Sequence, residues 1–153
     1  MEQLVIQPEF IFLEASVATA AESIKLAGQA YETAAIVKPS YTKAVITREE
    51  KFPTGLPADG FNIAIPHTDA EHVIKAGISV VVPEKPVKFK MMGNPEVELE
   101  CQIIFPLAME HPQKQLELLM SLMEFFQDKN KLEKIVKAKD KQTVIDVLRE
   151  LNI

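Results

Sequence analysis

Apolar residues recur at helical spacing in two stretches of the first third of the chain. The first stretch places them at i, i+3, i+4 and i+7, namely Val17, Ala20, Ala21 and Ile24. This period predicts a helix with Ser16 as its N-cap and Gly28 as its stop. A second helix is predicted after its cap Ser40, with an apolar face that starts at Tyr41.

The middle of the chain has the pattern of strands. Short β-branched runs at 63–65 and 78–82 are typical of buried strands, and the lysine-flanked apolar residues of 87–89 predict an edge strand. Strict alternation over 97–107, with polar partners only in its first half, predicts one strand that becomes covered on both faces. The segment 52–60, FPTGLPADG, predicts a turn throughout.

From Pro112 onward the pattern is helical. Asp128 and Asp140 are predicted N-caps of two helices near the end. The helix before them is expected to turn this stripe to the core: Leu116, Leu119, Met120 and Met123, widened by Leu118, Leu122 and Phe125. Its methionines are more typical of core filling than of a cofactor site. Helices before and after the strands predict the α/β class, with one sheet covered by helices.

The bulk composition narrows the function. At 153 residues, 47% hydrophobic and 25% charged, the chain is long enough to bury roughly 70% of its unfolded surface without a metal or disulfide. A net charge of −5 argues against nucleic acid and anionic membranes as partners. The single cysteine, Cys101, is predicted to be an inert core thiol and fits a reducing compartment. With no signal peptide or membrane-length apolar run, a cytoplasmic location is expected.

The chain has three histidines, His67, His72 and His111. In NIAIPHTDAEH an apolar run and a proline precede His67, so a core strand is predicted to hold this imidazole at its end. The spacing of His67 and His72 and the lack of an H-E-x-x-H pattern or cysteine pair disfavour a metal site. Serine-nucleophile, P-loop and dinucleotide motifs are absent from the sequence. A histidine that acts alone, as general base or as nucleophile, remains.

Arg48 favours the nucleophile. It takes the last place of the i, i+3, i+4, i+7 stripe that begins at Tyr41, which predicts a guanidinium at the edge of the core. There it could bind a phosphoryl group in a bidentate fork, with backbone N–H groups of Thr68 and Asp69 as further donors. Two alternatives stay open: Arg48 only covers the helix end with its stem, and Asp69 either orients His67 or only turns the chain.

Three segments resemble, in this order, the IIA component of the phosphoenolpyruvate-dependent sugar phosphotransferase system, fructose–mannitol class: REEKFPTGL (48–56), IAIPHTD (63–69) and QLELLMSL (115–122). The resemblance implies one domain over residues 1–153, a single mixed β-sheet flanked by helices on both faces, and no cofactor. It implies that His67 accepts a phosphoryl group on Nε2 from phospho-HPr and passes it to a cysteine of a IIB component. Arg48 matches the active-site arginine of the family, and Thr54 and Gly55 its PTG turn near the histidine.

One position departs from the family pattern. Many members carry a second histidine at the start of the later helix, where this chain has Gln115. Glutamine can donate a hydrogen bond but cannot carry a proton or a positive charge. His111 is four residues too early to take that role, and it is expected, like His72, in a surface loop. The segments HPQKQL and FPTG resemble the galactitol-type branch, which implies uptake of galactitol or a related polyol through a membrane IIC permease.

Two other functions stay open. In one, the chain is a regulatory module of the same fold, and the phosphorylation state of His67 signals to a transcription regulator or kinase. In the other, it is a small hydrolase or metal protein that uses His67 as base or ligand. The lysine-rich segment 129–141 is expected to be the solvated face of a helix.

Overall fold

The computed structural model describes residues 4–58, 60–111 and 116–151, and only the backbone of residues 118 and 119. The helices are α1 (Ala20–Thr33), α2 (Tyr41–Lys51), α3 (Leu116–Phe126), α4 (Lys129–Val136) and α5 (Lys141–Leu148), with 3-10 turns at Pro8–Phe10 and Ala70–His72. The strands are β1 (Ile11–Ala15), β2 (Gly55–Ala58), β3 (Phe61–Ala64), β4 (Gly77–Ile78), β5 (Val80–Pro83), β6 (Val87–Met91), β7 (Asn94–Cys101), β8 (Ile103–Ile104) and β9 (Leu107–Ala108). Over these described ranges, no helix has both the length and the apolar character to cross a membrane.

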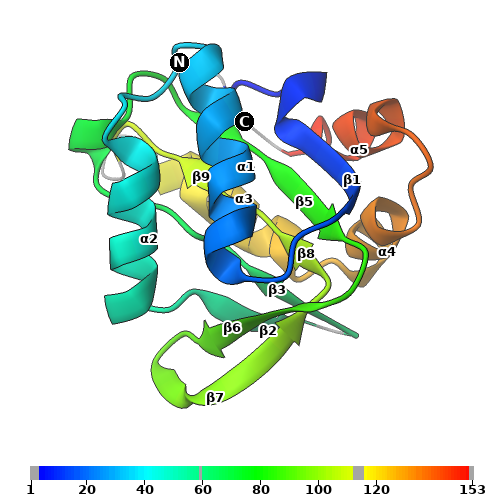
Figure 1. Cartoon of the computed structure of the whole chain (residues 1–153). Coiled ribbons are helices and arrows are strands. Elements are labelled where there is room, and N and C mark those ends of the chain that lie inside the picture. The colour runs from blue at the N-terminus through cyan, green and yellow to red at the C-terminus, as the bar shows by residue number, and fades with distance from the viewer. Residues whose placement is uncertain (1–3, 59, 112–115, 152–153) are drawn as a thin grey trace.

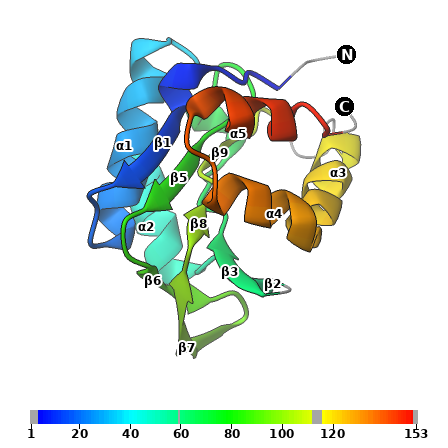
Figure 2. The same ribbon diagram turned by 90° about the vertical axis from the view of Figure 1, so that its right-hand side faces the viewer.

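Among the described residues, seven strands form one sheet in the order β1-β5-β8-β3-β2-β6-β7, and β4 pairs with β9 in a second, small sheet. The large sheet is mixed: β1–β5, β2–β6 and β3–β8 are parallel, whereas β2–β3, β5–β8 and β6–β7 are antiparallel. Helices α1 and α2 cover one face, and α3, α4 and α5 lie on the other (Figures 1 and 2). The predicted fold class is confirmed.

Buried tyrosines fix α1 and α2 against the sheet. The Tyr31 hydroxyl donates to the carbonyl of Pro106 at 2.6 Å, and the Tyr41 hydroxyl donates to that of Leu107 at 2.7 Å. Their rings stack edge to face, 5.6 Å apart, and Phe10 packs on Tyr31 at 4.7 Å. Because both hydroxyls and both rings are fully buried, α2 is held in one position over the sheet.

The ends of the first helix differ from the prediction. Helix α1 is capped by Thr19, whose Oγ1 accepts from the Glu22 N–H at 3.2 Å, and not by Ser16. Gly28, the predicted stop, lies inside α1. A Cβ there would collide with the Thr42 hydroxyl and come within 3.0 Å of its Cβ, so the glycine allows α1 and α2 to pack closely. Sequence period alone does not reveal this contact.

The predicted turn over 52–60 is wrong in part. Gly55–Ala58 forms β2, which pairs antiparallel with β3 in a hairpin, and Gly60 with its φ of +81° lies between the two strands. Pro57 is tolerated because β2 forms only one ladder pair, at Gly55, on its β6 side.

The later strands are more divided than expected. The run 78–82 is split between β4 and β5, and the alternating run 97–107 is split among β7, β8 and β9. The predicted edge strand exists as β6, but it lies between β2 and β7, so β7 is at the edge. Val97 of β7 is exposed, whereas β8 and β9 are buried, so the expected covering of the second half is confirmed.

In the last three helices the two predicted caps are confirmed, and the predicted core stripe is confirmed only at its widening members Leu122 and Phe125. Asp128 and Asp140 accept from backbone N–H groups at 3.2 and 2.8 Å, as N-caps do. In α3, Leu116 and Met120 are 57% and 63% exposed, and Met123 is also exposed. The buried side chains of this helix include Leu122, Phe125 and Phe126. The sheet therefore contacts the flank of the predicted stripe, and these methionines do not fill the core.

Candidate active site at the end of β3

The end of β3 presents His67, half-buried, at the surface. β3 is fourth in the order of the seven strands that the described residues contribute to the large sheet, so its end lies mid-sheet. Ile65 and Pro66 follow the strand, and the proline cannot donate to a further ladder bond. The Pro66 carbonyl accepts from Leu107 N–H at 2.8 Å, which ties the loop to the neighbouring segment. The imidazole thus follows the end of a core strand, as the sequence predicted, and backbone hydrogen bonding holds the residue before it.

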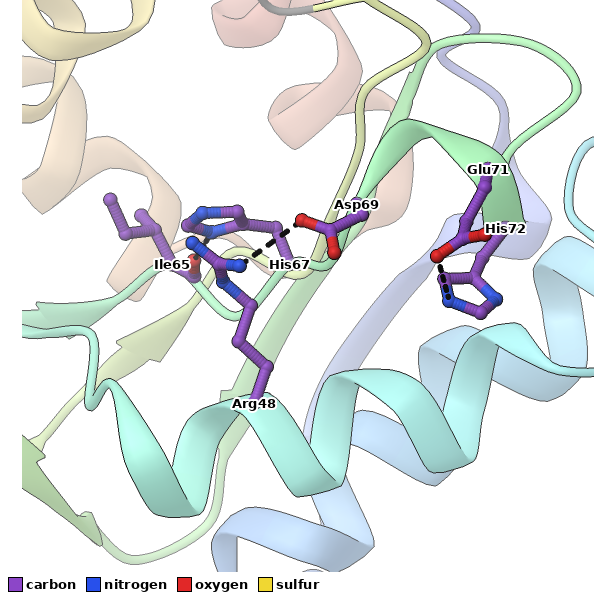
Figure 3. Close-up of polar contacts among 6 residues, drawn as sticks. All are labelled: Arg48, Ile65, His67, Asp69, Glu71 and His72. Carbon is purple, nitrogen blue, oxygen red and sulfur yellow. Dashed lines mark hydrogen bonds and ion pairs between the residues drawn. The ribbon is translucent and has the colours of Figure 1, made fainter.

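One hydrogen bond sets the tautomer of His67. Its Nδ1 lies 2.7 Å from the Ile65 carbonyl oxygen (Figure 3). Because a carbonyl only accepts, Nδ1 carries the proton, and the lone pair of the neutral ring is on Nε2. Burial lowers the pKa of His67 below 6.5, with the positive charge of Arg48 acting in the same direction, against the Ile65 hydrogen bond and Asp69. The ring is therefore neutral and nucleophilic at neutral pH.

Arg48 rises from the last turns of α2 toward His67 and Asp69 (Figure 3). Its Nη1 donates to Asp69 Oδ1 at 3.2 Å, and its Cζ lies 5.5 Å from the centre of the Phe52 ring. The side chain is 36% exposed, which places the guanidinium at the edge of the core as expected. Asp69 is thus a direct partner of Arg48, and its charge also raises the pKa of His67.

Thr54 supports the site from behind. It is 3% exposed, and its Oγ1 accepts from the Ile65 N–H at 3.2 Å. Its own N–H and Oγ1–H donate to Glu49 Oε2 and Oε1 at 2.8 and 2.7 Å. Gly55 has a different reason to be glycine, because a Cβ there would lie 2.6 Å from the Lys90 carbonyl oxygen where β2 meets β6.

Glu49 also supports the site, through its hydrogen bonds to Thr54, and it was not predicted from the sequence. A weak signal exists, since it directly follows Arg48 and lies four residues after the buried Val45. Its contact with Thr54 depends on how the loop folds back, which the period of α2 does not show.

Of the remaining predicted residues, the structure describes Thr68, His72 and His111. Thr68 is buried directly after His67. His72 ends the 3-10 turn Ala70–His72, and its Nδ1 lies 2.8 Å from Oγ of Ser40, just before α2. Its Nε2 lies 3.6 Å from Glu71 Oε1 (Figure 3). His111 is exposed just beyond β9. Gln115 lies outside the described residues, so its part at the site stays a prediction.

The surface beside Arg48 is a shallow, positively charged hollow. The hollow is lined by side chains of α2 and of the loop after His67, among them Lys43, Arg48, Lys51, Phe52 and Thr68. Such a surface suits an anionic group on a protein partner. In the part of the chain that the structure describes, no group of three or more His, Cys, Asp or Glu side chains could hold a metal ion. Cys101 is buried, and burial together with the Glu49 charge raises its pKa to about 12.

Comparison with known proteins shows which family this chain resembles. Residues 4–151 match the model of a family described as phosphoenolpyruvate-dependent sugar phosphotransferase system, EIIA 2. The galactitol-specific EIIA component of Escherichia coli is 30% identical over 107 residues, 70% of this chain and 71% of that protein. The mannitol-specific enzyme IIA component of Bacillus subtilis is 28% identical over 151 residues, 97% and 99% of the two chains. The mannitol enzyme IIA of Escherichia coli, solved in complex with phosphorylated enzyme IIB, superposes with a TM-score of 0.76 at 24% identity, over 96% of this chain and 99% of that one.

Proposed function

The chain belongs to the EIIA 2 family of the phosphoenolpyruvate-dependent sugar phosphotransferase system, and on that premise we propose that His67 is its phosphoryl carrier. Members of the family are phosphotransferases that pass a phosphoryl group by way of a histidine in sugar or polyol transport. We assign the whole of residues 1–153 to one such domain. In this proposal it works in the cytoplasm without a cofactor, accepts from phospho-HPr, and donates to a cysteine of its IIB component beside a membrane IIC permease.

The observation that carries the proposal is the hydrogen bond from His67 Nδ1–H to the Ile65 carbonyl at 2.7 Å. It leaves Nε2 with the lone pair, on a ring that burial keeps neutral. An in-line attack by Nε2 on the phosphorus of phospho-HPr forms the Nε2–P bond as the N–P bond of the donor breaks. The electron pair of that bond returns to the histidine of HPr, and His67 keeps its Nδ1 proton throughout.

Arg48 supplies the charge that the incoming group needs. Its resting partner Asp69 is 69% exposed, and an exposed pair of this kind is weak enough to exchange for a phosphoryl oxygen. Backbone N–H groups of Thr68 and Asp69 are proposed as further donors. In the second step the thiolate of IIB attacks the same phosphorus, the S–P bond forms, and the Nε2–P bond breaks to restore the neutral ring.

The sugar is proposed from the sequence branch and the relatives together. The segments FPTG and HPQKQL resemble the galactitol-type branch of the family. A galactitol component is among the relatives, as is a mannitol component that aligns over nearly the whole chain. We propose galactitol or a related polyol as the substrate of the system that this chain serves. Gln115, in place of the second histidine of the family, is proposed as a hydrogen-bond donor to the phosphoryl oxygen or the imidazole.

A relay assay tests this function. The protein would be incubated with labelled phosphoenolpyruvate, enzyme I and HPr, and then with IIB proteins of galactitol and mannitol systems. Label that reaches the galactitol IIB fastest supports the proposal, and His67→Ala should abolish transfer while the matched variant His72→Ala keeps it. A protein that is phosphorylated but transfers the phosphoryl group to neither IIB protein would favour the regulatory function instead.

A further inference from the structure

Two consecutive residues of α2 reach the site from different directions. Arg48 extends toward His67 and Asp69 (Figure 3), while the neighbouring Glu49 accepts hydrogen bonds from Thr54 in the loop after α2. The Glu49 side chain is half-buried, yet the phosphoryl transfer described above makes no use of it. A buried carboxyl group costs free energy unless its hydrogen bonds compensate, so its presence calls for a reason.

Its hydrogen bonds lead to His67 in three steps. Glu49 accepts two bonds from Thr54, one from its N–H at 2.8 Å and one from its hydroxyl at 2.7 Å. Because the Thr54 hydroxyl donates its proton to Glu49, its oxygen can accept a hydrogen bond from the Ile65 N–H, at 3.2 Å. The carbonyl of the same Ile65 then accepts from His67 Nδ1 at 2.7 Å.

Ile65 depends on this support because it has left the strand. β3 ends at Ala64, and the residue after Ile65, Pro66, has no N–H with which to continue the ladder. The Thr54 carbonyl is only a long second acceptor for the Ile65 N–H, at 3.4 Å. The Thr54 hydroxyl, held by Glu49, is therefore the closer anchor of the residue whose carbonyl sets the His67 tautomer.

We propose that Glu49 is a positioning residue for phosphoryl transfer: through Thr54 and Ile65 it keeps the His67 proton on Nδ1 and the lone pair on Nε2. The kinetic half of this inference rests on the proposed function, whereas the tautomer half does not. Glu49 does not touch the reacting atoms, so it acts on the rate at saturating donor and not on the affinity for HPr.

The ionised carboxylate is the form that completes the chain, since it offers an acceptor to each of the two Thr54 donors. Burial raises the pKa of Glu49 to about 7, against the two hydrogen bonds from Thr54, which lower it. The ionisable groups around it are Glu50 on α2, Lys88 and Lys90 on β6, and Glu98 and Cys101 on β7. The support of His67 should therefore strengthen as pH rises through about 7.

The test compares Glu49→Ala and Glu49→Gln with the matched control Glu50→Gln, which changes the same charge on an exposed neighbour. Nitrogen-15 NMR of the His67 ring reports the tautomer without any partner. We expect Nδ1–H in the wild type and in the control, and a mixture with Nε2–H in Glu49→Ala. Transfer from saturating phospho-HPr should fall about 10-fold in Glu49→Ala, with KM within about twofold.

The pH profile separates positioning from a purely structural role. Glutamine mimics the protonated carboxyl, so the rate of Glu49→Gln divided by that of the wild type should fall as pH rises through about 7, while the ratio for the control stays level. The ratio removes the titration of HPr itself. An unchanged ring spectrum in Glu49→Ala overturns the proposal. A wild type that takes no phosphoryl group overturns the proposed function, and the ring spectra still decide the role of Glu49.

Discussion

Replacing Arg48 by alanine should slow phosphoryl transfer strongly but lower the free energy of unfolding only slightly. The ion pair with Asp69 joins side chains that are 36% and 69% exposed, so it is worth about 0–1 kcal/mol. The Phe52 contact at 5.5 Å, also at the surface, adds about 0.5–1 kcal/mol. The free energy of unfolding should therefore drop by only about 1 kcal/mol. A charge-assisted bond to the phosphoryl group is worth about 1.5–3 kcal/mol, which predicts a 10- to 100-fold slower transfer.

Rapid-quench measurement of transfer from phospho-HPr checks this magnitude. Arg48→Lys keeps the charge but loses the planar fork, so an intermediate rate is expected. Lys51→Ala removes a cation from the same hollow and controls for general attraction of an anionic partner. NMR titration should also show a higher pKa of His67 in Arg48→Ala, since the arginine charge lowers it. Transfer by Arg48→Ala within twofold of the wild type would refute the assigned role.

Other consequences of the structure can be checked without a partner protein. Gly28→Ala should destabilise the protein by about 1–3 kcal/mol in urea unfolding, and should be neutral or stabilising in a Thr42→Ala background, because the collision is with that side chain; additive effects would contradict the contact. Asp69→Asn should lower the pKa of His67, because the carboxylate raises it; a rise in NMR titration would be inconsistent with this. Cys101, with its pKa raised to about 12, should resist iodoacetamide at pH 8 in the folded protein and react in urea; labelling of the folded protein would show that its strand opens.

The positions of His67 and Arg48 could be predicted because each is set by local sequence. His67 follows an apolar run and a proline, and the chain must leave the sheet where a buried strand ends, so the histidine comes to the surface. Arg48 completes a stripe of α2, and helical spacing alone brings it to the edge of the core. The N-caps Asp128 and Asp140 are equally local and were confirmed.

The remainder depends on contacts between distant segments. Gly28 was predicted to end the first helix, but it lies inside α1, where its lack of a side chain makes room for Thr42 of α2. β2 looked like a turn because its proline and glycine are turn residues, yet pairing with β3 makes it a strand. In α3 apolar residues occupy most of the helix surface, so their spacing does not show which flank of the stripe packs on the core; Leu122 is buried and Met120 is exposed. Glu49 was missed for the same reason, since its partner Thr54 is brought to it by the loop.

The central claim is that His67 carries the phosphoryl group on Nε2, and the most direct measurement is phosphorus–nitrogen NMR of the nitrogen-15-labelled protein after incubation with phosphoenolpyruvate, enzyme I and HPr. We predict one acid-labile phosphoryl group on His67, coupled to Nε2, while Nδ1 keeps its proton and its bond to the Ile65 carbonyl. The His67→Ala variant should take up none. A phosphoryl group on Nδ1 or on another residue, or a wild type that takes up none, would contradict the assignment of Nε2 of His67 as the carrier.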